Sequence, residues 1–229
     1  MGKTTFAMNI INNAVSEDYP SLFFSLEMSK QRIGRKHLSI LTGIHGEKLK
    51  KGHLADEDWP KIKEAQEKMS AQPLYIDDSA ALSVTQIRAR SRLMVNRFGI
   101  KLIVVDYIGL CKGSGESRAD EIREVSAGLK ALAKELDVPV IALAQLNRKC
   151  EDRTDKKPIL SDLRDSGAIE QDADIVMFVY RDEMYNKSDD NPKKGEADII
   201  IAKHRDGETG VAKLYFRGSV SRFENKVWD

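Results

Sequence analysis

The sequence has few cysteines and almost no net charge, and each shortage narrows what the chain can be. Its two cysteines, Cys111 and Cys150, lie far apart without the spacing of a disulfide framework or a zinc site, which favours a reducing compartment. Lys and Arg total 37 against 36 Asp and Glu, so a net charge of +1 gives no general attraction to nucleic acid or to an anionic membrane. Any contact with a polyanion must therefore be local.

Long apolar runs are also missing. No stretch reaches the roughly 18 apolar residues that a membrane span needs, and no signal-peptide pattern opens the chain. We therefore expect a cytoplasmic protein with no membrane partner. Hydrophobic residues make up 41% and charged residues 32% of the 229 positions, which is the composition of a folded chain. This length fits one α/β domain spanning residues 1–229.

Short apolar runs alternate with longer stretches of helical periodicity, a pattern typical of β-α units around a parallel sheet. The predicted strands are Leu22–Leu26, Leu74–Ile76, Leu102–Val105, Val138–Ala144 and Ile175–Val179. The predicted helices are Thr4–Val15, Ser29–Leu41, Asp56–Met69, Val84–Phe98 and Arg118–Leu136. Each strand is almost wholly apolar, as expected where helices cover both faces of a sheet. Three further runs separated by Gly-containing turns predict an antiparallel extension of the sheet: Ala197–Ala202, Val211–Phe216 and Ser219–Phe223.

Polar residues at the ends of apolar strands are the candidates for a ligand site, because open parallel sheets bind ligands beyond the carboxyl ends of their strands. Five residues form this set: Glu27, Asp106, Gln145, Lys203 and Arg205. Lys3 and Thr4, at the N-terminus of a predicted helix, join them. Although they are widely separated in the chain, we expect them to converge on one crevice.

The opening residues MGKTT match the second half of the phosphate-binding loop G-x-x-x-x-G-K-[ST]. Backbone amides at the start of the first helix, from Gly2 to Thr5, would surround phosphate oxygens, and Lys3 would place its charge on the outer phosphates. The hydroxyl of Thr4 and the carboxylate of Asp106 would hold Mg²⁺. The pattern predicts a site for a nucleoside triphosphate with Mg²⁺.

Two polar strand ends complete this prediction. Glu27 is placed to polarise a water for attack on the γ-phosphate, and Gln145 to sense that phosphate. Each residue alone has a simpler explanation: GKTT is also an ordinary helix start, strands often end in Asp, Glu27 could cap the next helix, and Gln145 could be a turn residue. The coincidence of all four at strand ends favours the nucleotide site.

Five segments together resemble the RecA-like motor domain of DnaB-type replicative DNA helicases. They are FFSLEMS at 23–29, LIVVDYIGL at 102–110, IALAQLNR at 141–148, DLRDSGAIEQDADIVMFVYR at 162–181 and KHRDGETG at 203–210. The resemblance covers essentially the whole chain in order, and the stretch around SGAIEQDAD is its most specific part. It implies a RecA-like P-loop NTPase fold and an ATP-dependent DNA helicase that moves 5′ to 3′ on single-stranded DNA.

The resemblance also assigns roles. Lys3 and Thr4 match the phosphate and Mg²⁺ residues, Glu27 the catalytic glutamate, Asp106 the Walker B aspartate, and Gln145 the glutamine that links the nucleotide to the DNA loops. Lys203 and Arg205 match residues supplied to a neighbouring subunit, Arg205 as the arginine finger. A homo-hexameric ring follows from this exchange, because each site is then completed by the next subunit.

The remaining implications concern DNA and partner proteins. The segment DLRDSGAIEQ matches the part that holds single-stranded DNA by its phosphates, with Arg164, Asp165 and Gly167 as the binding residues. Family members usually carry Glu in place of Asp165, so a backbone contact is the better expectation there. A primase and a helicase loader are the expected partners.

The family's N-terminal domain, its linker helix and the first half of the phosphate loop do not precede Met1 in this sequence. Their absence predicts weaker nucleotide binding, and it favours a slow, monomeric fragment. Two rival functions stay open: a RecA-type recombinase or related ATPase, and a catalytically impaired ring or loader-binding module.

Overall fold

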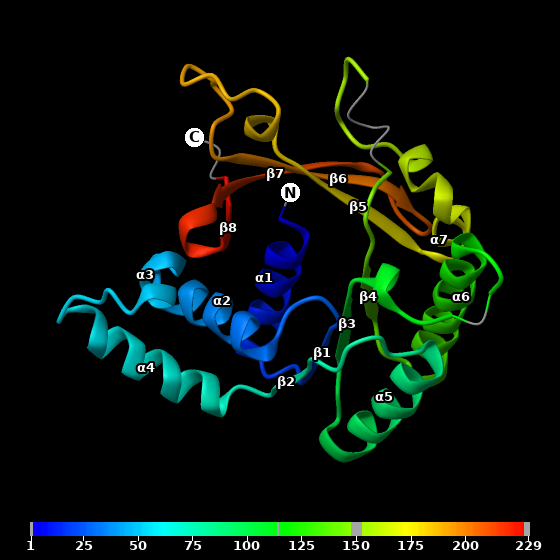
Figure 1. The fold of residues 1–229 in the computed structure, drawn as a ribbon, viewed down its shortest axis with the longest axis horizontal. Helices are drawn as coiled ribbons and strands as arrows, with labels where there is room; N and C mark the ends of the chain where they lie inside the picture. The colour runs from blue at the N-terminus through cyan, green and yellow to red at the C-terminus, as the bar shows by residue number, and fades with distance from the viewer. Residues whose placement is uncertain (1, 114, 148–152, 227–229) are drawn as a thin grey trace.

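A computed structural model describes residues 2–113, 115–147 and 153–226, and for residues 164–166 it describes the backbone only. Two four-stranded sheets organise this part of the chain. The first is parallel and lies between helices, and the second is antiparallel and crosses one end of that layered unit (Figure 1). Within the described residues, no helix combines the length and apolar character that a membrane span requires.

The parallel sheet has the strand order β2-β1-β3-β4. Its strands are β1 (Ser21–Ser25), β2 (Leu74–Asp77), β3 (Leu102–Asp106) and β4 (Val140–Leu143). Every residue of β1 and β3 is buried, which agrees with their largely apolar sequences. The register pairs Ser25 with Asp106, and Asp106 with Leu143, so the carboxyl ends of β1, β3 and β4 lie level with one another.

Helices cover both faces of this sheet, as Figure 1 shows. They are α1 (Lys3–Ser16) and α2 (Lys30–Thr42) on one face, and α5 (Val84–Phe98) and α6 (Arg118–Leu136) on the other. Side chains of β1 alternate between the two cores: Phe23 packs with α1 and α2, whereas Phe24 packs with α5 and α6. Burial of each such side chain contributes about 1.5–3 kcal/mol. The central strand therefore holds two helical layers together.

The other helices are short or peripheral. They are α3 (Gly46–Lys51), α4 (Asp58–Ala71), α7 (Gly167–Asp172) and the 3₁₀ turns η1 (Ile108–Leu110), η3 (Leu160–Ser166), η4 (Asp182–Met184) and η5 (Gly218–Val220). The five predicted helices are confirmed, α5 and α6 with the predicted bounds and the other three with shifts of one or two residues. Helix α3 is an element that the sequence pattern did not indicate.

The antiparallel sheet has the order β5-β6-β7-β8. Its strands are β5 (Ile175–Tyr180), β6 (Glu196–His204), β7 (Gly210–Arg217) and β8 (Arg222–Asn225). Asn9 of α1 joins this sheet to the parallel half, because its side chain donates to the carbonyl of Ser221 at 2.9 Å and accepts from the amide of Phe223 at 3.1 Å. The C-terminal strands thereby pack directly onto the first helix.

Two strand assignments from the sequence are wrong. Ser219–Phe223 was expected to be a strand, but η5 occupies its start and β8 begins only at Arg222. Ile175–Val179 was expected among the parallel strands, but β5 pairs antiparallel with β6. Ile175 and Met177 are exposed while Val176 and Phe178 are buried, so β5 covers a core with one face only. An apolar run does not reveal this difference, because its exposed positions are apolar as well. The α/β fold class with antiparallel C-terminal strands is confirmed, and within the described residues those strands form a sheet of their own.

Candidate functional site

Helix α1 begins beside the carboxyl edge of the parallel sheet. Gly2 precedes the helix in a left-handed conformation with φ of 104°, which glycine adopts without steric strain. No side chain among the described residues caps this end of the helix. Because first-turn amides have no acceptor inside a helix, those from Lys3 onward are available to an anion, and the helix dipole favours negative charge there.

Lys3 and Thr4 contact the ends of two neighbouring strands. The ammonium of Lys3 donates to the carbonyl oxygen of Ala144, just beyond β4, at 2.8 Å, and it lies 5.2 Å from the ring centre of Tyr107. The hydroxyl of Thr4 donates to the carboxylate of Asp106, the last residue of β3, at 2.6 Å. Residues at the start of the chain are thus fixed to segments more than a hundred positions away.

Asp106 is buried, with 1% of its surface exposed. Burial raises the pKa of its carboxyl group above the ordinary value, while the Thr4 hydroxyl and the charge of Lys3 act in the opposite direction. Burial likewise lowers the pKa of the Lys3 ammonium, opposed by the charges of Asp106 and Glu27. These groups therefore share one electrostatic environment in which the opposite charges stabilise each other.

Glu27 and Gln145 are exposed at the same edge. The amide of Leu26 donates to the carbonyl of Asp106 at 2.7 Å, which places Glu27 immediately past this contact. Gln145 directly follows Ala144, whose carbonyl binds Lys3. The alternative that Glu27 caps helix α2 is not what the structure shows, because Asp78 accepts the first amide of that helix, from Lys30, at 2.8 Å.

Lys36 is a further cation of this site that the sequence patterns did not indicate. It projects from α2 and donates to the hydroxyl of Thr5 at 3.3 Å. Burial lowers the pKa of its ammonium, the charge of Arg32 lowers it further, and the charge of Asp106 raises it. No motif marks the residue, although its spacing of three from Ile33 on the buried side of α2 could have placed it on an inward face.

Together these residues form an edge suited to a polyphosphate with a hard metal ion. Lys3, Lys36 and the amides of α1 supply positive potential, and the paired oxygens of Thr4 and Asp106 are the type of donors that Mg²⁺ prefers. Across the described residues, no cluster of three or more His, Cys, Asp or Glu side chains forms a protein-only metal site. A magnesium ion fits here as a partner of phosphate and water rather than as an ion enclosed by the protein.

Lys203 and Arg205 do not join this group, contrary to the expectation of a single crevice within one chain. The ammonium of Lys203 donates to the carbonyl of Glu170, near the end of α7, at 2.6 Å. The guanidinium of Arg205 contacts the carboxylate of Asp174 at 3.2 Å, and Asp174 also binds Lys130. These two cations lie instead where β6 ends beside α6 and α7.

The expected DNA-binding residues lie at the junction of η3 and α7. Arg164 and Asp165 belong to η3, and their side chains are outside the described part of the structure. Gly167 is exposed at the first position of α7. Apart from its chain neighbours and the backbone of its own helix, no described heavy atom lies within 4 Å of the place where its Cβ would be. The backbone at this glycine is therefore open to a large ligand.

A cavity of about 580 Å³ lies elsewhere, between β2 and α5. Its lining includes Tyr75, Asp77 and Arg90, and an ion pair joins the last two at 2.5 Å. None of the expected site residues lines it.

Comparison with known proteins places the chain among helicase domains. Residues 1–225 match the family described as DnaB-like helicase C terminal domain. The replicative DNA helicase DnaB of Pasteurella multocida (strain Pm70) is 50% identical over 231 residues, covering 98% of this chain and 49% of the relative. That of Geobacillus stearothermophilus is 45% identical over 229 residues, covering 98% and 50%. The chain thus spans about half the length of the curated relatives it matches.

Solved structures agree with this relationship. One solved structure, described as an ATPase domain, superposes with a TM-score of 0.94 at 38% identity, over 99% of this chain and 81% of the other. A DnaB-like replicative helicase, solved in a study of its interactions with primase, also superposes with a TM-score of 0.94. It is 39% identical, and the match covers 99% of this chain and 55% of the other. The fold, the ordered motifs and these matches agree: the chain belongs to the DnaB-like helicase C-terminal domain family.

Proposed function

We propose that this chain is the ATP-hydrolysing motor of a replicative DNA helicase. The observation that carries the proposal is the contact of Lys3 with Ala144 and of Thr4 with Asp106, which gathers cations, a hydroxyl and two carboxylates at one edge of the parallel sheet. Curated relatives that are 50% identical to this chain over the aligned residues are named as replicative DNA helicases, which supports the assignment.

The residues at the sheet edge divide the work of phosphoryl transfer. Amides from Gly2 to Thr5 and the ammonium of Lys3 bind the phosphates of ATP, and Lys36 adds a second positive charge. Thr4 and Asp106 hold the Mg²⁺, which when bound neutralises charge on the β- and γ-phosphates. Glu27 orients and deprotonates the attacking water, a role suited to an exposed carboxylate beside the buried Asp106.

Gln145 is the residue through which the nucleotide state reaches the DNA-binding segment. It follows the carbonyl that Lys3 contacts, so a ligand that draws Lys3 away from Ala144 acts directly on its backbone. Single-stranded DNA binds at Arg164, Asp165 and Gly167, mainly through its phosphates. The open space beside Gly167 supports a close approach of the DNA backbone at this point.

Lys203 and Arg205 act on the site of a neighbouring subunit. Their distance in sequence and structure from the Lys3 group of their own chain supports this exchange, and the side chain of Arg205 is 54% exposed. A cation that completes the next site requires a closed head-to-tail ring, for which we propose a homo-hexamer. A primase and a loader are the proposed partners, and the proposed location is the cytoplasm of a bacterium or of a phage-infected cell.

The test uses the natural protein that contains this chain. ATP hydrolysis is measured with and without an oligo(dT) strand, and unwinding is measured on a forked duplex with a 5′ tail. We expect DNA-stimulated hydrolysis and unwinding, both abolished by Lys3→Ala. A hydrolysis rate that does not change when DNA is added would overturn the helicase assignment. Strand exchange without unwinding would favour a recombinase. Absence of hydrolysis would favour the impaired ring or loader-binding module.

A further inference from the structure

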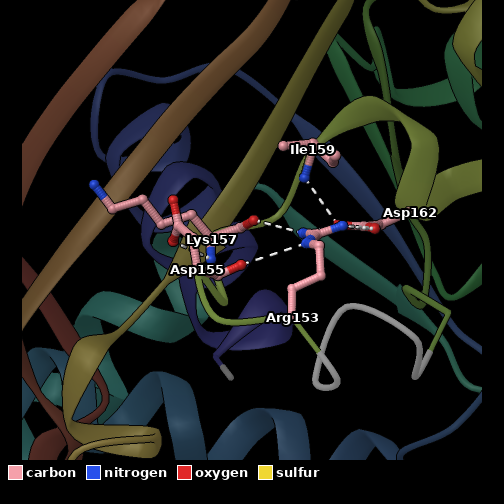
Figure 2. Close-up of polar contacts among 5 residues, drawn as sticks. All are labelled: Arg153, Asp155, Lys157, Ile159 and Asp162. Atoms are coloured by element: carbon pink, nitrogen blue, oxygen red, sulfur yellow. Dashed lines mark hydrogen bonds and ion pairs between the residues drawn. The ribbon is translucent and has the colours of Figure 1, made fainter.

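The segment from Arg153 to Asp162, which leads into η3, is held by one arginine (Figure 2). The guanidinium of Arg153 makes two parallel contacts with the carboxylate of Asp162, at 2.5 Å and 2.8 Å. It also donates to the carbonyls of Lys157 at 2.8 Å and Asp155 at 3.3 Å. Two-pronged pairing of this kind is both strong and directional. The intervening loop is thereby closed around a single side chain.

Asp162 connects this loop to two other parts of the chain. Its carboxylate accepts the amide of Ile159 at 2.9 Å, and its backbone carbonyl accepts the amide of Asn147 at 3.1 Å. The side chain of Asp162 is only 5% exposed, so loss of Arg153 would leave a buried charge without its main partner. Leu163, the next residue, packs against Phe178 of β5. The start of η3 is therefore fixed on two sides.

The same contacts lead back to the proposed phosphate site. Lys3 binds the carbonyl of Ala144, and Asn147 three residues later binds Asp162. From Asp162 the chain runs directly through η3 to Gly167. A short, hydrogen-bonded path thus joins the cation of the phosphate site to the segment proposed to bind DNA.

We propose that Arg153 and Asp162 are positioning residues for DNA binding, holding the backbone of η3 and the start of α7 in the conformation that receives single-stranded DNA. This inference rests on the proposed function of that segment. Arg153 itself is not assigned as a DNA contact: its four hydrogen bonds to protein oxygens engage most of its donors, and the carboxylate of Asp162 neutralises its charge.

The test compares Arg153→Ala, Arg153→Lys and Asp162→Asn in the natural protein that contains this chain. The probe is a fluorescently labelled oligo(dT), and its dissociation constant is measured by anisotropy beside the basal ATPase rate. Each variant is expected to bind DNA more weakly, on the order of tenfold, because the segment that it loosens must then be ordered when the DNA binds. Basal hydrolysis is expected to stay within about twofold of the parent. The double variant should lose little more than either single variant, since the residues act as one unit.

Two readouts separate positioning from a direct charge effect. Removal of the negative charge in Asp162→Asn would strengthen DNA binding if charge alone mattered, whereas positioning predicts weaker binding. If Arg153 contacted a phosphate, Arg153→Ala would reduce the slope of log affinity against log salt concentration by about one. A positioning role predicts that this slope stays unchanged. Arg153→Lys keeps the charge but loses the two-pronged geometry, so positioning predicts that it resembles Arg153→Ala.

The matched control is Arg92→Ala, which removes another two-pronged Arg–carboxylate pair, with Glu135, between α5 and α6. It should leave DNA binding unchanged. A parent protein that fails to bind oligo(dT) would refute the proposed function itself. A parent that binds DNA while the Arg153 and Asp162 variants bind equally well would refute only the positioning role. Equal weakening by Arg92→Ala, or matching loss of basal hydrolysis, would also refute it by showing general damage.

Discussion

The two groups of proposed catalytic cations differ in how firmly their own chain holds them. Lys3 is partly buried between α1 and the ends of β3 and β4, and its neighbour Asp106 is 1% exposed. The side chain of Arg205 is 54% exposed, and its carboxylate partner Asp174 is 51% exposed. Exposed ion pairs contribute between zero and about 1 kcal/mol, so Arg205 can exchange partners at little cost. Lys3 belongs to a site formed within its own chain with Thr4 and Asp106, which we call the built site. Arg205 is available to the corresponding site of another molecule.

The largest expected effect concerns Arg205. Arg205→Ala should reduce ATP turnover on the order of 10³–10⁵-fold in assembled protein, because an arginine finger stabilises charge that develops in the transition state. Mixing Arg205→Ala subunits with Lys3→Ala subunits should restore activity, since an interface between the two variants contains one intact Lys3 and one intact Arg205. The measurement is steady-state hydrolysis across a series of mixing ratios.

The control mixes subunits that carry Lys3→Ala with subunits that carry Glu27→Gln. Both changes affect the same sheet edge, so no interface between these subunits is intact and no activity should return. Recovery in the control mixture, or none in the Arg205 mixture, would contradict the separation of the two regions into halves of a shared site.

The next effect concerns the carboxylates of the built site. Glu27→Gln should reduce turnover about 10²–10⁴-fold, because an amide cannot accept the proton of the attacking water. Nucleotide affinity should remain close to the parent value, since Glu27 is exposed and no phosphate-binding role is proposed for it. The measurement is fluorescent-nucleotide binding beside hydrolysis. Undiminished hydrolysis would remove Glu27 from the mechanism.

The parallel sheet and the antiparallel sheet also differ in how well the sequence predicts them. The edge of the parallel sheet could be predicted because β1 and β3 are buried on both faces, so apolar runs define them and a single polar residue marks where each ends. β5 carries the same kind of apolar run but pairs antiparallel, and its exposed Ile175 and Met177 conceal the alternation that would have shown this. Local pattern thus reports burial better than it reports strand direction.

Residues that act through tertiary contacts were beyond the sequence. Lys36 lies on α2, an ordinary amphipathic helix by its sequence. Only the packing of α2 against α1 brings its ammonium to Thr5. The pairing of Arg153 with Asp162 likewise depends on a loop closure that no motif encodes. Strand ends are visible in a sequence because the chemistry changes abruptly there. Helical spacing can place a residue on an inward face, but the contact that the residue makes there, like a loop closure, is not visible.

The parallel-sheet region also contains a buried histidine that should make the stability of the fold sensitive to acid. His37 of α2 is 2% exposed, and burial lowers its pKa from 6.5 to about 4, with the charge of Lys68 acting in the same direction. Because the unfolded chain binds the proton more readily, stability should be fully present above about pH 6.5 and should fall as the pH decreases toward 4. The loss should reach about 3 kcal/mol.

Urea unfolding at a series of pH values measures this effect. His37→Gln should flatten the pH dependence of the unfolding free energy between pH 6.5 and 4. The control is His53→Gln in an exposed segment, which should keep the dependence of the parent protein. If the parent and His37→Gln lose stability equally over this range, His37 is not the group responsible for the difference.

The smallest expected effect tests how far the built site extends. Lys36→Ala should weaken nucleotide binding about tenfold, or about 1.4 kcal/mol, because it removes a second cation while leaving Lys3 in place. Lys36→Arg should retain most of the affinity. Arg35→Ala, an exposed neighbour on the same helix, is the matched control and should bind as the parent does. Equal losses at both positions would show that the general charge of α2 attracts the nucleotide, and Lys36 would then lie outside the site that Lys3 defines.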